Sequence, residues 1–147
     1  MASYTATTTQ TVAAGEAVVW QNTIVKGNCN IQHRNGTAGV KVRGTGCMLN
    51  PKVYEVSAHV VLTAIAAVPM QMALALDGEV IPGSTIAVVP AAIGDVISAT
   101  TIAQIPVDCG CSHITLVAIT AGVPVTSAII NVLKYLFGIG IFIYMIF

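Results

Sequence analysis

The sequence predicts an all-β fold, an antiparallel two-sheet β-sandwich (jelly roll) with a short hydrophobic C-terminal segment. Turn residues recur about every 8–15 positions and separate short runs rich in β-branched side chains, as in sandwiches and barrels. The run Val53–Ala64 alternates apolar and polar side chains at period two, which is typical of a strand with one buried face. No segment before residue 126 shows the apolar spacing of an amphipathic helix.

About nine or ten strands are expected, joined by recognisable turns. Asn35-Gly36 and Asp77-Gly78 are two-residue hairpin signals, because Gly adopts a positive φ without steric cost. Pro82-Gly83 ends the return of the second hairpin, since Pro cannot donate to a ladder. The expected strands are Ala17–Val25, Asn28–Arg34, Gly39–Arg43, Val53–Ala64, Met70–Leu76, Glu79–Ile81, Thr85–Val89, Asp95–Ala103, His113–Thr120 and Ala128–Leu133.

The hairpin Met70–Thr85 has two faces of different character. Met70, Met72 and Leu74 point to one side and supply core, whereas small residues occupy the other side. Small apolar residues on an outward face suit close packing against another subunit, and they predict oligomer contacts at Ala73 and Ala75. The residues interpreted as small and outward-facing are Ala58, Ala73, Ala75, Ala99 and Ala103.

Composition divides the chain into three parts: an N-terminal arm (1–12), a sandwich domain (13–133) and a hydrophobic tail (134–147). The Thr-rich start is polar and uncharged, and it is interpreted as an arm or a first edge strand. It has neither a basic region nor an apolar stretch, so no secretory signal is expected. The chain is therefore expected to fold in a cytoplasm with its cysteines as thiols.

Charge is sparse, which favours a subunit covered by neighbours over a free monomer. Of the 147 residues, 55% are hydrophobic and 8% are charged. The net charge is zero, which gives no basic field for nucleic acid. Five basic residues precede five of the acidic ones along the chain. This segregation is typical either of charges that pair between subunits or of scattered surface charges. The five basic residues are Lys26, Arg34, Lys41, Arg43 and Lys52.

No motif for catalysis or cofactor binding is present, so the sequence predicts a protein that is not an enzyme and holds no cofactor. Cys109, Cys111 and His113 are ligands that zinc accepts, but strand spacing holds them apart, and no metal site is expected. A disulfide from Cys29 to Cys47 or Cys109 and buried thiols are the two alternatives for the cysteines.

The histidines and the tryptophan have structural interpretations. His33, His59 and His113 are either satisfied polar groups on sheet surfaces or parts of a pH-sensitive interface. Trp20, the single tryptophan, is expected in the core.

The tail Tyr135–Phe147 is uncharged and 13 residues long. As a helix it would extend about 20 Å, less than the roughly 30 Å of a bilayer core. We expect it to be buried against other subunits, with oligomer contacts from four large side chains. Membrane contact and an origin foreign to the domain are the alternatives. The four side chains are Leu136, Phe137, Ile141 and Phe142.

Four segments carry a resemblance to a known group of proteins: Met1–Val12, Ile31–Gly36, the hairpin ALALDGEVIPGS (Ala73–Ser84) and Ala128–Leu133. Together they resemble small tumour necrosis factor-like jelly-roll proteins, which are structural proteins of phages and prophages of Gram-positive gut bacteria. The same fold occurs in the C-terminal domains of collagen-like spore-surface glycoproteins. The resemblance covers most of residues 1–133, and the hydrophobic tail departs from it.

The resemblance implies a homotrimer displayed on a particle surface, and it carries over no catalytic residues. The sequence thus predicts a virion protein whose partners are other capsid proteins, as a capsid decoration, head fibre or other surface module. The alternatives are a carbohydrate- or receptor-binding fibre-tip module, a spore-surface protein, or a membrane-associated protein acting through its tail.

Overall fold

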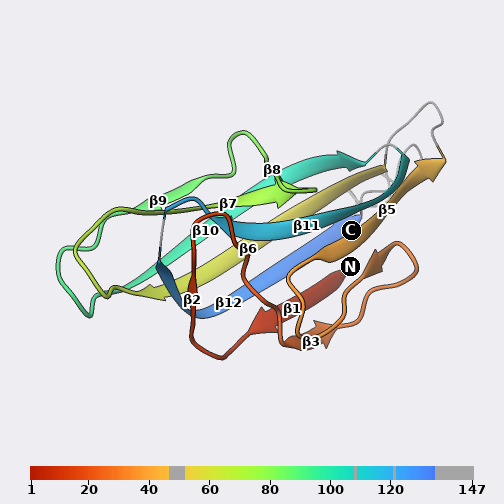
Figure 1. Ribbon diagram of the computed structural model, residues 1–147. Coiled ribbons are helices and arrows are strands. Elements are labelled where there is room, and N and C mark those ends of the chain that lie inside the picture. The colour runs from red at the N-terminus through yellow and green to blue at the C-terminus, as the bar shows by residue number, and fades with distance from the viewer. Residues whose placement is uncertain (47–51, 108, 121, 135–147) are drawn as a thin grey trace, which may run out of the picture.

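The computed structural model describes residues 1–46, 52–107, 109–120 and 122–134. Every regular element in these ranges is a β-strand, and the strands form two antiparallel sheets (Figure 1). This confirms the predicted all-β, two-sheet fold. The described residues include no helix long and apolar enough to cross a membrane.

Sheet A contains the three longest strands of the fold. Its order is β10-β6-β12-β1-β3, with β2 paired to β12. The bounds are β1 Ala2–Ala6, β2 Gln10–Val12, β3 Asn22–Val25, β6 Lys52–Thr63, β10 Val96–Val107 and β12 Val123–Lys134. β6 pairs with β10 along its whole length, from Val96 opposite Thr63 to Val107 opposite Lys52.

Sheet B forms the second layer, in the order β4-β5-β11-β7-β8 with β9 paired to β7. The bounds are β4 Ile31–Gln32, β5 Val40–Gly46, β7 Met70–Leu76, β8 Glu79–Val80, β9 Ile86–Val88 and β11 Cys109–Ala118. Figure 1 shows β7 and β11 running alongside the long strands of sheet A as a separate layer.

The core lies between the two sheets and is built by period-two alternation. On β6, Tyr54, Val56 and Leu62 are buried while their neighbours along the strand are half-buried. Met72 and Leu74 of β7 close the core from sheet B, as predicted. Trp20 is fully buried, which confirms its predicted place. Burial of each large side chain contributes roughly 1.5–3 kcal/mol.

The expected N-terminal arm is instead an interior strand. β1 pairs with β12 on one side and with β3 on the other. Ala2, Tyr4 and Ala6 are buried at period two, so this segment contributes core on one face. The prediction followed the polar Thr and Ser residues and missed the alternating apolar ones between them.

The two predicted turns have different outcomes. Asp77 and Gly78 both have positive φ, 51° and 85°, as a tight two-residue hairpin turn requires. Asn35-Gly36 lies inside a longer connection, because β4 and β5 pair only at Ile31 and Gln32. Backbone bonds to Trp20 fasten this longer loop instead.

Strand ends also differ from the expected ones. The expected strand Ala17–Val25 is divided into isolated bridges at Ala17 and Trp20 and the short strand β3. β12 begins at Val123, earlier than expected, because its first residues pair with β2. Cross-strand partners of this kind are not visible in a single segment.

The small residues expected on outward faces lie elsewhere. Ala58 is buried in the core, and Ala99 and Ala103 pack against the core from β10. Ala73 and Ala75 have exposed fractions of 0%. All five face neighbours within the chain, because small residues also fit where two layers pack closely.

Candidate functional site

Five basic side chains gather at the end of the molecule where β4 and β5 lie. Lys41 and Arg43 are exposed on β5, and Lys26 and Arg34 are exposed in the loops on either side of β4. Lys52 begins β6, and its Nζ donates a hydrogen bond to Asn30 Oδ1 at 2.8 Å. We call these five residues, with the neutral polar side chains between them, the basic surface.

Three cavities open along the basic surface. A cavity of 480 Å³ is lined by Gln32, His33, Arg34, Thr37, Gly39, Lys41 and His113. A second, of 210 Å³, is lined by Cys29, Asn30, Gln32, Lys41, Arg43 and Cys111. A third, of 490 Å³, is lined by Tyr4, Thr23, Lys26, Gly27, Asn28, Cys29, Ile31, Gln32 and His33. Gln32 borders all three, and no Asp or Glu among the described residues lines any of them.

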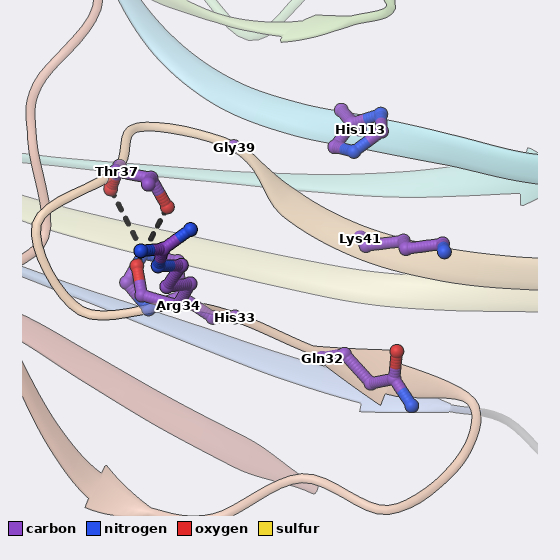
Figure 2. A pocket seen from close by; sticks show the side chains of 7 residues that line it. All are labelled: Gln32, His33, Arg34, Thr37, Gly39, Lys41 and His113. Atoms are coloured by element: carbon purple, nitrogen blue, oxygen red, sulfur yellow. Dashed lines mark hydrogen bonds between the residues drawn. The ribbon is translucent and has the colours of Figure 1, made fainter.

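The register of sheet B explains why the first cavity contains side chains from three strands. Gln32 of β4 is opposite Lys41 of β5, and Lys41 is opposite His113 of β11. Residues opposite one another point to the same face of a sheet. Figure 2 shows these three side chains on neighbouring strands along the cavity.

The loop between β3 and β4 is held tightly against the strand that follows it. A Cβ placed on Gly27 would lie 2.0 Å from the carbonyl oxygen of Ile31, so only glycine fits there. Asn28 Oδ1 accepts a hydrogen bond from the backbone N–H of Asn30 at 2.8 Å. This turn fixes the position of Lys26 relative to β4.

Side-chain to backbone bonds fasten the loop between β4 and β5. His33 Nε2 donates to the carbonyl oxygen of Thr37 at 2.8 Å, and Thr37 Oγ1 donates to the carbonyl oxygen of Arg34 at 2.6 Å (Figure 2). The His33 ring packs on Tyr4 with ring centroids 4.6 Å apart. Its buried Nδ1 has no hydrogen-bond partner among the described residues.

The positive charges of this region act on one another. Partial burial of Lys52 lowers the pKa of its ammonium group, and the nearby cations Lys134 and Arg43 lower it further. The hydroxyl of Tyr54 donates to the carbonyl oxygen of Arg43, and burial raises the pKa of this phenol. The core residue Tyr54 thereby positions the backbone that carries Arg43.

The cysteines differ from the buried thiols considered in the sequence. Cys29 and Cys111 are free and exposed, and both line the second cavity. Cys47 and the side chain of Cys109 lie outside the described residues. Among the residues that the structure describes, no three His, Cys, Asp or Glu side chains cluster as metal ligands.

Two of the three histidines, His33 and His113, border the first cavity, and His59 lies on sheet A. His33 is in the loop after β4, and His113 is exposed on β11, with its backbone N–H donating to Asp77 Oδ1 at 2.9 Å. His59 is on β6, where its Nδ1 and Thr100 Oγ1 are 2.8 Å apart. They do not form one interface on a single chain.

The predicted oligomer contacts have two outcomes. Ala73 and Ala75 are buried within the chain and are not part of its exposed surface. Their role as oligomer contacts stays a prediction. Leu136, Phe137, Ile141 and Phe142 lie outside the described residues.

A second surface of interest is the outward face of sheet A, which we call the sheet A face. It is extended and contains few charges. Its residues are Val96, Ser98, Thr100, Ile102, Gln104 and Pro106 of β10, Val53, Glu55, Ser57, His59, Val61 and Thr63 of β6, and Ser127, Ile129, Asn131 and Leu133 of β12.

Comparisons with known proteins identify the fold. No protein-family model matches the chain, and no curated protein matches it. Among solved structures, an Eiger TNF from S. frugiperda matches with a TM-score of 0.66 and 13% identity, over 93% of this chain and 92% of that one. The globular domain of a zebrafish complement 1qA protein matches with a TM-score of 0.61 and 12% identity, over 90% of this chain and 94% of that one. Both likenesses confirm the predicted jelly-roll sandwich.

Proposed function

We propose that this protein is a non-enzymatic structural subunit of a bacteriophage particle, assembled as a homotrimer through the sheet A face. The observation that carries the proposal is the chemistry of that face. Ile102 and Val96 of β10 are 58% and 69% exposed, although a free monomer gains stability by covering such side chains.

The register aligns apolar and small polar residues in rows across three strands. Ile129, His59 and Thr100 form one row, because β6 pairs with both β12 and β10 at this level. The next row contains Asn131, Ser57 and Ile102. Short side chains between apolar ones leave a surface that another sheet can approach closely.

Covering this face would desolvate few charges. Glu55 is the single residue among Asp, Glu, Lys and Arg on this face, and His59 is its single imidazole. The cores of protein interfaces are likewise depleted of charged residues. In a closed three-fold ring the contacts are heterologous, so one part of the face meets a different part of the face on the next subunit, and a face turned toward the axis supplies both parts.

Two further observations support a place in a virion. The chain resembles jelly-roll structural proteins of phages over most of residues 1–133. Only 8% of its residues are charged, as suits a surface largely covered by other subunits. Other particle proteins are then its partners, and the virion is its location. The jelly roll is a scaffold without chemistry of its own, so the role comes from its surfaces.

Purified particles test this function. Phage particles induced from the strain that encodes the chain are banded by density and analysed by quantitative mass spectrometry. The chain is expected in the particle band, at a constant ratio to the main shell protein after a salt wash. Particles that band without the chain, while it stays in the soluble host fraction, would contradict the proposal.

A further inference from the structure

We infer that the basic surface binds an acidic polysaccharide, a hydroxyl-rich chain that bears carboxylate or sulfate groups. This inference is independent of the proposed trimer, because no residue of the basic surface belongs to the sheet A face. The first observation is charge: five of the chain's six Lys and Arg residues lie on this surface.

The positive charge of the surface is not cancelled by side chains that line its cavities. No carboxylate among the described residues borders them. Asp77, on the other side of His113, accepts a bond from the His113 backbone and lies outside the cavity linings. Clefts lined by one sign of charge focus their field on ligands of the opposite sign.

The cavities form a continuous run suited to an extended ligand. The cavity that contains Arg34 shares Lys41 with the cavity that contains Arg43. The cavity that contains Arg43 also shares Cys29 with the cavity that contains Lys26. A linear chain lying across them would meet cations at intervals.

Neutral donors between the cations indicate a ligand with hydroxyl groups. Asn28, Asn30 and Gln32 present amide groups along these linings. The hydroxyls of Thr23 and Thr37 donate within the chain, to Asn35 Oδ1 and to the Arg34 carbonyl oxygen, and can accept a hydrogen bond from a ligand. Amide and hydroxyl side chains both donate to and accept from sugar hydroxyls, whereas Lys and Arg only donate.

The aromatic residues favour a polysaccharide over a single-stranded nucleic acid. Tyr4, which borders the third cavity, is buried with its ring against His33, so it offers no open face to a base. Tyr54 and Trp20 are also buried. Proteins that bind single-stranded nucleic acid stack bases on exposed aromatic side chains, and the described part of this surface has none.

Dextran sulfate and unsulfated dextran are a matched pair of probes, because they differ only in anionic groups. The full chain is expected to bind dextran sulfate and not dextran in titration calorimetry at about 0.1 M NaCl, where the screening length is about 10 Å. The variant K41Q/R43Q removes two cations from β5 and is expected to weaken binding by at least about tenfold.

The control variant V89E/I93E lowers the net charge by the same amount at two exposed residues away from the surface. It is expected to bind within about twofold of the natural chain, since distant exposed charges are screened by salt. If K41Q/R43Q fails to fold, as judged by circular dichroism, K26Q/R34Q in the flanking loops replaces it.

Three results would overturn the inference. The first is no binding of dextran sulfate by the natural chain. The second is equal weakening by K41Q/R43Q and by V89E/I93E, which would mean attraction by net charge alone. The third is equal or tighter binding of a thymidine oligonucleotide, which would assign the surface to a phosphodiester chain.

Discussion

The sheet A face and the basic surface belong to one sandwich but have opposite chemistry. The sheet A face extends over three long strands and includes one residue among Asp, Glu, Lys and Arg, which is Glu55. The basic surface is made by β4, β5, the loops around β4 and the first residue of β6, and it includes five cations. Sparse charge in this chain is therefore a property of one face. Long, evenly paired strands present a flat face that suits a second copy, whereas loops present side chains that suit a ligand.

Charge placed on the sheet A face is expected to have the largest effect on assembly. The variant I102E/I129E puts one carboxylate on β10 and one on β12, the strands on either side of β6, where assembly would bury them unpaired. We expect complete loss of the trimer, measured as mass by light scattering, with the sandwich still folded. K41Q/R43Q is the matched control and is expected to stay trimeric. Loss of the trimer in both variants would remove the distinction between the two faces.

Gly27→Ala tests whether the loop of the basic surface is held by close packing. The new Cβ would meet the carbonyl oxygen of Ile31, so the backbone must shift. We expect the unfolding free energy to fall by about 1–3 kcal/mol, the usual range for overpacking. Thermal unfolding measures it, and Lys26→Ala, one residue away, is the control. Equal melting of Gly27→Ala and the natural chain would contradict the tight loop.

Tyr54→Phe tests the link between the core and the basic surface. The variant loses the hydrogen bond to the Arg43 carbonyl and is expected to lose about 1 kcal/mol of stability. Burial raises the pKa of Tyr54 above its ordinary value of 10.0. The unfolded state therefore releases this proton first, and the stability of the natural chain should fall as pH rises above about 10.

Chemical denaturation at pH 8 and at pH 10.5 checks this expectation. The natural chain should lose more stability between the two values than Tyr54→Phe does. The same loss in both proteins would show that Tyr54 does not cause the alkaline dependence.

Salt concentration should affect assembly and ligand binding differently, and this requires no substitution. The trimer is attributed to apolar packing, so its mass should be unchanged between about 0.1 and 1 M NaCl, where screening shortens from about 10 to 3 Å. Binding of dextran sulfate at the basic surface should decline steadily over the same range. Dissociation of the trimer by salt would mean that charge pairs hold it together.

The fold was predictable because its main features are local. The alternation in β6 and the Asp77-Gly78 turn both follow from the residues themselves. The failures were non-local. β1 became interior because β12 and β3 pair with it, and Ala99 faces the core because of the register between β10 and β6. The sequence of one strand does not show which strand pairs with it, or in which register.

The candidate surfaces were only partly predictable. The cluster of basic residues between positions 26 and 52 was visible as a charge pattern. Its assembly into one surface depends on the pairing of Lys41 with Gln32 and His113 across three strands. The β10 part of the sheet A face was missed because Ile102 looks like a core residue when the buried face of its strand is unknown.

The mass of the full chain in solution is the direct test of assembly through the sheet A face. We expect light scattering on the eluting peak to give three times the 15.1 kDa chain mass, unchanged on dilution to low micromolar concentration. A single species of 15.1 kDa under the same conditions would contradict assembly through the sheet A face.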